Sequence, residues 1–141
     1  MIIRTDTIHL ESRGNTDIID ITSDVQKIID THAVTAGQVL VFVPGSTGGL
    51  TTIEYEPGLM KDLPEAYERI APTGRTYHHD AAWGDGNGYA HVRASLTGSS
   101  VLVPIQNGKM TLGTWQQIIF IDFDNRPRDR NIIVQVTGIS E

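Results

Sequence analysis

The chain has 141 residues, of which 39% are hydrophobic and 20% charged, and this composition predicts one globular domain over residues 1–141. The 17 acidic and 11 basic residues give a formal net charge of -6, which argues against nucleic acid or anionic lipid as a partner. The chain has no cysteine and no apolar run near the ~20 residues that span a bilayer. We therefore expect no thiolate ligand, no membrane insertion and a cytoplasmic location.

The N-terminal part predicts two strands and a helix. Polar and apolar residues alternate over 1–10, a second apolar segment covers 17–21, and the turn between them predicts a β-hairpin. Ser23 and Gln26, spaced as in a capping box, predict a helix near 22–34.

A strand and a glycine-rich loop follow this helix. The β-branched and aromatic run at 39–43 predicts a central strand that is covered on both faces. The loop at 45–49 combines glycines with two hydroxyls, so its backbone amides could approach an anionic ligand, although an ordinary connecting loop has the same composition. A short strand is predicted at 51–56, and it carries Glu54.

Two further helices are predicted in the middle of the chain. Apolar residues at helical spacing over 59–71 predict a helix that breaks near Pro64. Residues 90–96 predict a short helix whose Val92 and Leu96 face the core, since they are four residues apart.

The C-terminal part is rich in strands. Its apolar segments predict strands at 100–105, 110–112, 117–124 and 131–138. The Asn107-Gly108 pair predicts a two-residue type I′ turn, and the charged segment at 126–130 is interpreted as an exposed connection. The whole pattern predicts an α+β fold with seven or eight strands in a mainly antiparallel sheet or sandwich and two or three helices.

Residues 77–100 hold the densest group of polar side chains that can do chemistry. The candidate residues there are His78, His79, Asp80, Asp85, Asn87, His91, Arg93 and Ser95. A loop rich in glycine and aspartate can bring such groups together, so this segment is the first candidate site. A solvated turn with surface histidines has the same composition.

Four motifs occur together and in order: YHHD at 77–80, HVRASLTGSS at 91–100, GTWQ at 113–116 and IIVQVTG at 132–138. With them, nearly the whole chain resembles the YjbQ-like family, whose members are often labelled secondary thiamine-phosphate synthases. The resemblance implies a compact α+β fold and a homotrimer with pockets between subunits. It also implies a phosphate-substrate transfer activity of the thiamine-phosphate synthase type.

The resemblance implies a catalytic set of His79, His91, Glu54 and Arg93. We predict that the substrate-binding residues are Ser46, Thr47, Asp85, Asn87, Ser95, Thr114, Trp115 and Gln116. Trp115 is expected to pack near the site or at a subunit contact. The chain departs from the family pattern at Gly45, where members usually have a histidine after Val-Pro, and at Tyr89, where some members have another.

Two kinds of site chemistry follow from these residues. A zinc-type site needs three or four N/O ligands, of which His79 and His91 would be two, with Glu54 or Asp80 completing the set. His78 could not replace the missing histidine if residues 77–80 are extended, because adjacent side chains then point to opposite faces. Glycine at position 45 should leave a void and weaken zinc binding.

The second chemistry needs no protein-bound zinc. A small phosphorylated metabolite would be held by Arg93, Ser46, Thr47 and the loop amides, with His79 or His91 as general acid and Mg²⁺ bridging a departing pyrophosphate. The non-enzymatic alternative is a catalytically impaired, metabolite- or anion-binding or structural trimer that has lost the histidine at Gly45. Hydrolysis by Ser46 or Ser95 has no nucleophile-elbow motif to support it.

Overall fold

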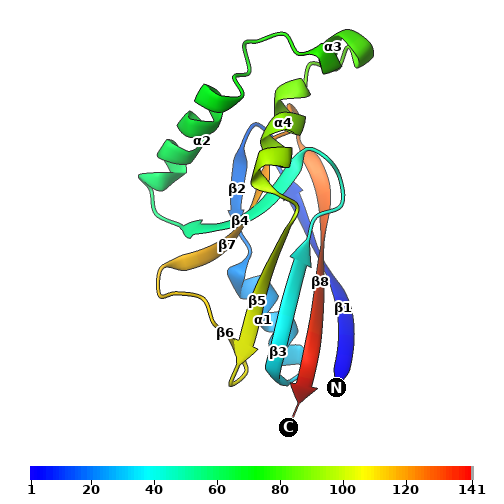
Figure 1. Cartoon of the computed structure of the whole chain (residues 1–141), viewed down its shortest axis with the longest axis vertical. Coiled ribbons are helices and arrows are strands. Elements are labelled where there is room, and N and C mark those ends of the chain that lie inside the picture. The colour runs from blue at the N-terminus through cyan, green and yellow to red at the C-terminus, as the bar shows by residue number, and fades with distance from the viewer. Residues whose placement is uncertain (141) are drawn as a thin grey trace.

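The computed structural model describes residues 1–140, which form eight strands and four helices in one compact α+β domain (Figure 1). The strands are β1 (Ile2–Ser12), β2 (Asp17–Asp20), β3 (Val34–Phe42), β4 (Gly48–Glu54), β5 (Ser100–Gln106), β6 (Lys109–Met110), β7 (Gln116–Asp122) and β8 (Arg128–Ser140). The helices are α1 (Thr22–Thr31), α2 (Leu59–Ile70), α3 (His78–Trp83) and α4 (Gly88–Thr97).

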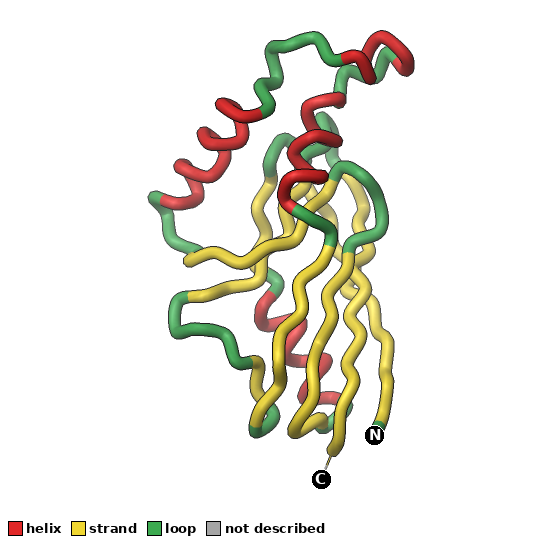
Figure 2. The backbone as a smooth tube through the Cα atoms, viewed as in Figure 1, coloured by secondary structure: helices red, strands yellow, loops and turns green. Residues whose placement is uncertain are grey.

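The strands form two antiparallel sheets. The larger sheet has the order β1-β8-β3-β5-β6 and the smaller one β2-β7-β4. In Figure 2 the long strands of the larger sheet run alongside one another, while α2, α3 and α4 lie toward the end opposite the two termini. The α+β class, the antiparallel order and the number of strands are as predicted. Helix α3 was not predicted, because its residues were expected to be extended or in a loop.

β7 is the strand that both hydrophobic cores share. Ile118 and Phe120 are fully buried in the core that α1 and the larger sheet complete. Ile119 and Ile121, on the opposite face, are fully buried in a second core with α4 residues. The strand covered on both faces is therefore β7.

The prediction that β3 is covered on both faces is wrong for the single chain. Val39 and Val41 are buried, but Phe42 is 41% exposed, because its side chain alternates to the outer face of the larger sheet. On the neighbouring strand β5, Leu102 is 58% exposed.

The predicted N-terminal hairpin is also wrong. β1 pairs with β8 in the larger sheet, whereas β2 pairs with β7 in the smaller one. Three consecutive residues between them, Gly14, Asn15 and Thr16, have positive φ angles of 73°, 55° and 64°. Their left-handed backbone redirects the chain from one sheet to the other, a geometry that residue composition alone does not distinguish from a hairpin turn.

α1 forms as predicted, but its capping box does not. The helix begins after Ile21 without a side-chain cap. Gln26 instead donates to the Gly108 carbonyl and accepts from the Met110 amide. It thus ties α1 to the β5–β6 turn, whose Asn107 and Gly108 have the positive φ angles of the predicted type I′ turn.

The predictions for the two middle helices need correction. α2 runs unbroken through Pro64, which costs one backbone hydrogen bond without ending the helix. In α4, Val92 and Leu96 are exposed, and the buried face is formed by Tyr89, Ala90 and Ala94. A short helix has few turns, so its inward face is decided by the packing of α4 against the small sheet rather than by one apolar pair.

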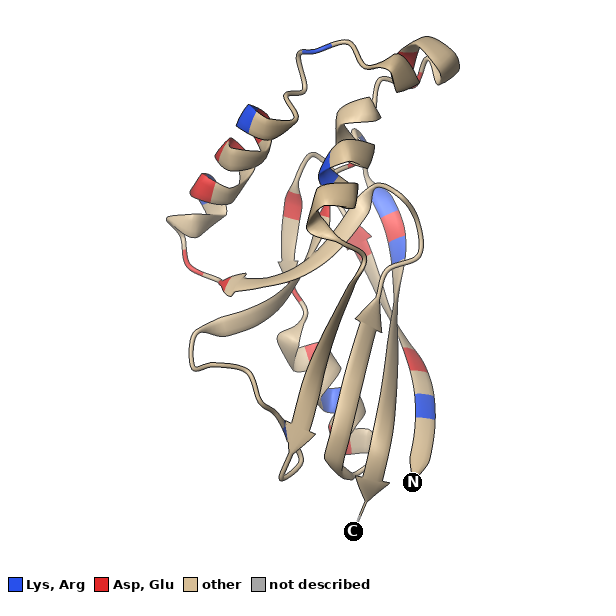
Figure 3. Cartoon of the chain, viewed as in Figure 1, with Lys and Arg blue, Asp and Glu red and all other residues tan. Residues whose placement is uncertain are grey.

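β8 begins three residues earlier than the sequence predicted. Arg128 and Arg130 belong to the strand, and Arg130 is buried, so the charged segment at 126–130 is only partly an exposed connection. Figure 3 shows basic and acidic residues alternating at the start of β8 and mixed along α2. Within residues 1–140, no helix combines the length and the apolar character that crossing a membrane requires.

Candidate functional site

The candidate site lies where α3 packs against α4. The rings of His79, from α3, and His91, from α4, have centroids 4.4 Å apart and planes inclined by 41°. Asp80 positions these helices, because its carboxylate accepts the Tyr77 amide at 3.1 Å and the Gly88 amide at 3.0 Å. These two backbone hydrogen bonds hold the pKa of Asp80 below its usual range.

A Cβ at Gly88 would lie 2.5 Å from the Tyr77 Cβ, so this approach of the two segments requires glycine. Since residues 78–83 are helical, the argument that excluded His78 on an extended strand does not apply as stated. His78 is nevertheless exposed, and of the two histidines His79 is the one whose ring contacts that of His91.

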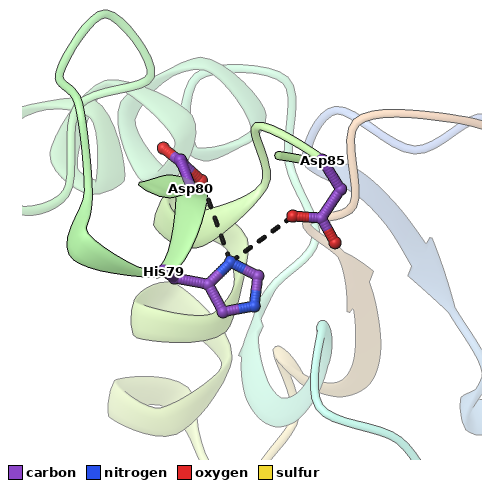
Figure 4. A group of neighbouring side chains, drawn as sticks. All are labelled: His79, Asp80 and Asp85. Atoms are coloured by element: carbon purple, nitrogen blue, oxygen red, sulfur yellow. Dashed lines mark ion pairs between the residues drawn. The ribbon is translucent and has the colours of Figure 1, made fainter. Parts of the chain in front are cut away.

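A metal ion needs several histidine, aspartate or glutamate side chains close together. Within residues 1–140, one group of three such side chains is compact enough: His79, Asp80 and Asp85, whose ligand atoms lie within 4.8 Å of one another. His79 Nδ1 lies 3.8 Å from Asp80 Oδ1 and 3.5 Å from Asp85 Oδ1 (Figure 4). This nitrogen is enclosed and has no hydrogen-bond partner among the described residues. An enclosed, unpaired imidazole nitrogen that faces two carboxylates fits a divalent cation with N/O ligands.

A pocket of about 290 Å³ adjoins this cluster through His91. Its walls come from the loop before β4 and from α4 with the turn that follows it: Gly45, Ser46, Gly48, His91, Ala94, Ser95, Gly98 and Ser99. Three hydroxyls and an imidazole therefore line a space bounded otherwise by small residues. Such a lining suits a small polar ligand, because hydroxyls donate and accept and glycines let the ligand approach the backbone.

A buried polar network lies beneath the loop that forms the pocket. Arg130 makes a bidentate pair with Asp122, with N···O distances of 2.8 and 2.9 Å, and Asp122 also accepts from Ser12 Oγ. Thr47 Oγ1 accepts from Arg130 Nη2 and donates to Asp124. These bonds hold the loop from below.

Asp124 joins the network to the loop before α4 through Asn87, whose amide donates to Asp124 Oδ1 at 3.2 Å. Burial alone would raise the pKa of Asp124. The hydrogen bonds from Asn87 and from the Asn125 amide, with the charge of Arg128, outweigh burial and lower the pKa. Thr47 and Asn87, which were predicted to bind substrate, are therefore engaged within the protein. Asn87 Oδ1 is enclosed and has no hydrogen-bond partner among residues 1–140.

Arg93 lies on the inner face of α4, away from the pocket lining. Its side chain is 3% exposed and donates to the Ala71 carbonyl, Thr16 Oγ1 and Glu68 Oε2. The expectation that Arg93 converges with His79 and His91 is thus wrong within one chain. Arg93 follows His91 by two positions, and this spacing places their side chains on different sides of a helix.

Glu54 and the GTWQ segment lie at the other end of the small sheet. Glu54 pairs with Gln116, whereas Gly48, which lines the pocket, pairs with Asp122. The two pairs are six positions apart along the strand, roughly 20 Å. Thr114, Trp115 and Gln116 are exposed, and Trp115 is 72% exposed in the single chain. One chain therefore does not bring Glu54 to His79.

The space expected at Gly45 lies between the pocket and Arg130. Gly45 has φ 112°, and a Cβ there would point at Arg130 Nη1, 3.3 Å away. Arg130, Asp122 and Asp124 were missed as site residues. The signal available was the IDFD run, because two carboxylates inside a strand that is otherwise apolar must be paired when the strand is buried.

Comparison with known proteins agrees with the sequence motifs. The sequence profile of the family described as "UPF0047 protein YjbQ-like" matches residues 6–139. A UPF0047 protein of Archaeoglobus fulgidus is 42% identical over 126 residues, which cover 89% of this chain and 95% of that protein. The UPF0047 protein YugU of Bacillus subtilis is 31% identical, over 94% of this chain and 98% of its own length.

Solved structures give the same result for the fold. A YbjQ-like protein of unknown function from Sulfolobus solfataricus superposes with a TM-score of 0.93 at 29% identity, covering 98% of this chain and 99% of that one. A YjbQ/UPF0047 family protein of Clostridium acetobutylicum superposes with a TM-score of 0.86 at 37% identity, covering 94% and 99%. The chain therefore belongs to the YjbQ-like UPF0047 family.

Proposed function

We propose that the chain binds a small phosphorylated metabolite in the pocket beside α4 and acts on it as a transferase of the thiamine-phosphate synthase type. The observation that carries the proposal is the contact between His79 and His91, because it joins a pocket lined by hydroxyls to a cluster of carboxylates. The resemblance of the sequence to proteins labelled as secondary thiamine-phosphate synthases supports the reaction class.

The reaction couples a pyrimidine diphosphate to a thiazole phosphate and releases pyrophosphate. The site must therefore hold phosphate groups and stabilise a leaving group as its negative charge develops. His91 lines the pocket and can donate a proton to that leaving group, since histidine exchanges protons near neutral pH. Ser46 and Ser95 offer hydroxyl donors to phosphate oxygens.

A divalent cation would be held by His79, Asp80 and Asp85. The enclosed, unpaired Nδ1 of His79 supports this assignment. A bound cation would neutralise phosphate charge. The residues of the chain itself position the imidazole of His91 through its contact with His79 and hold the loop at Gly45–Gly48 from below.

The proposal is tested by assaying the purified protein with the two phosphorylated substrates and Mg²⁺, and measuring both thiamine phosphate and pyrophosphate. Loss of a general acid should lower turnover by about a hundredfold or more in His91→Ala. His78→Ala is the matched control, because His78 is exposed on the same helix as His79 and should leave turnover unchanged. Wild-type turnover that His91→Ala retains would exclude this role for His91.

A homotrimer is part of the proposal. Phe42 and Leu102 expose apolar surface on the larger sheet, and Trp115 is exposed beside Glu54. Association would cover such side chains. It would also let the end of one chain that carries Glu54 complete the His79–His91 end of another, which would account for site residues that one chain keeps apart.

The second candidate function is binding of the metabolite without turnover. Gly45 favours it, because this position carries no ligand atom beyond its backbone and faces Arg130. Phosphate binding by a protein that shows no turnover with any divalent cation would select this candidate over the transferase.

A further inference from the structure

One donor nitrogen of Arg130 makes no hydrogen bond to any acceptor in the described part of the chain. Its Nε donates to Asp122 Oδ2 at 2.8 Å, and its Nη2 donates to Thr47 Oγ1 at 2.8 Å and to Asp122 Oδ1 at 2.9 Å. The side chain is 7% exposed. Nη1 donates no hydrogen bond within residues 1–140, and it is not one of the fully enclosed unpaired atoms, so solvent reaches it.

The space in front of Nη1 opens at Gly45. A Cβ at this position would lie 3.3 Å from Nη1, and no other atom of residues 1–140, apart from those of the adjacent residues, would come within 4 Å of it. Gly45 is also part of the pocket lining. Any side chain at position 45 would therefore start between Arg130 and the pocket, and the glycine leaves that approach open.

We propose that Arg130 is an anion-binding residue of this pocket, with Nη1 holding an oxygen of a phosphate group through the gap at Gly45. The hydroxyls of Ser46 and Ser95 provide further contacts on the pocket side. This inference rests on the proposed function, because it takes the same pocket as the ligand site. It assigns the charged phosphate contact to Arg130, since Arg93 uses its guanidinium elsewhere.

Asp122 limits the charge of this site but improves its geometry. Its bidentate pair with Arg130 makes the two side chains together nearly neutral, so the site attracts an anion through a directed hydrogen bond rather than through net charge. The same pair fixes the plane of the guanidinium and hence the direction of Nη1. Both oxygens of Asp122 are already engaged, Oδ2 by Ser12 and Oδ1 by the Asp124 amide as well.

The experiment measures binding of inorganic phosphate to the full chain by titration calorimetry, with chelator present so that no divalent cation contributes. Arg130→Lys keeps a positive charge near Asp122 but removes the fork that presents Nη1, and we expect phosphate affinity to fall about tenfold. Arg128→Lys is the matched control, because Arg128 lies on the same strand and faces Asp124. Its affinity should stay within about twofold of the wild type.

Gly45→Ala tests the same contact while both partners of the ion pair, Arg130 and Asp122, are retained. The added methyl group covers Nη1 and should also weaken phosphate binding several-fold. Gly108→Ala controls for the strain of alanine at positive φ, since Gly108 has φ 77° in a turn that does not line the pocket. Thermal unfolding shows whether Arg130→Lys is folded. If it is not, the phosphate affinity of Gly45→Ala decides whether Nη1 binds the anion.

Wild-type protein that binds no phosphate up to about 10 mM would overturn the inference, as would folded variants that all bind like the wild type. The proposed function fails separately. Phosphate binding that depends on Arg130 in a protein without transferase turnover would refute the activity and keep the anion site. Turnover that is unaffected by Gly45→Ala and Arg130→Lys would refute the anion site and keep the transferase activity.

Discussion

The rings of His79 and His91 are in contact, with centroids 4.4 Å apart and planes tilted by 41°, although they belong to different helices and lie 12 positions apart in the sequence. Their contact is the point at which the carboxylate cluster and the pocket meet. His79 faces Asp80 and Asp85, whereas His91 faces the hydroxyl lining. Substitutions on the two sides should therefore have separable effects on metal binding and on the pocket.

His79→Ala should weaken zinc binding at least tenfold, because it removes the one imidazole in the cluster of ligand atoms. Titration calorimetry of the metal-free protein measures this. His78→Ala should bind zinc like the wild type, since His78 is exposed beside the cluster. Equal affinities for wild type and His79→Ala would show that the cluster is not a metal site.

Arg93→Met should destabilise the fold and leave phosphate affinity unchanged. The guanidinium is buried and joins α4 to the carbonyl of Ala71, the hydroxyl of Thr16 and the partly exposed Glu68. Leaving these groups unpaired should cost about 2–3 kcal/mol of unfolding free energy, which urea denaturation measures. A folded Arg93→Met protein that no longer binds phosphate would show that Arg93 belongs to the ligand site.

Gly45→His should be compared with Gly45→Ala rather than with the wild type alone. Both variants carry the strain of a side chain at φ 112°, about 1–2 kcal/mol, so both should unfold at lower urea concentration. Only the histidine adds a ligand atom. Zinc should bind Gly45→His at least tenfold more tightly than Gly45→Ala, and equal affinities would exclude position 45 from the metal site.

Asp124 should make stability fall as the pH is lowered. Its folded pKa lies below the ordinary value of 3.8, so at acidic pH the unfolded chain takes up a proton that the folded chain does not. The stabilisation is complete above that ordinary value and is lost as the pH falls through the folded pKa. Asp80 and Glu68 are shifted in the same direction.

Urea unfolding at pH 6, 5, 4 and 3 isolates the contribution of Asp124. The free energy of unfolding of Asp124→Asn should be lower than that of the wild type at pH 6 and should depend less on pH. Asp129→Asn, which changes an exposed carboxylate on the same segment, should keep the wild-type slope. Parallel slopes for the wild type and Asp124→Asn would refute the assigned linkage.

Leu102→Asp should prevent the proposed association. It places a charge on the exposed apolar face of the larger sheet, where desolvation would oppose any contact, while the single-chain fold keeps its cores. Light scattering coupled to size exclusion should give the mass of a trimer for the wild type and of a monomer for the variant. Lys61→Asp, on the exposed side of α2, is the control. A trimer that survives Leu102→Asp would place the interface elsewhere.

Local patterns predicted most of the fold because the strands and helices carry strong short-range signals. The Asn107-Gly108 turn and β7 follow directly from residue type and order. The pairing of β1 with β8 does not, because three left-handed residues at Gly14–Thr16 decide it and only one of them is glycine. A positive φ at asparagine and threonine depends on hydrogen bonds to residues 122 and 124, more than 100 positions away.

The candidate site was also predictable only in part. Motif resemblance pointed to His79 and His91, and the structure brings them together. It did not separate Arg93 from His91, although two positions on the predicted helix place their side chains on different sides. Arg130 was hidden among charged neighbours, and only its pairing with Asp122 distinguishes it from an exposed arginine.

β7 gives the domain a single unfolding unit. Its successive side chains alternate between the two cores, so the strand cannot leave the sheet unless both cores open. The amide hydrogens of β7 should therefore exchange with deuterium only when the entire chain unfolds. Loosening α2 or α4 alone would leave them protected, because β2 and β4 remain hydrogen-bonded on either side.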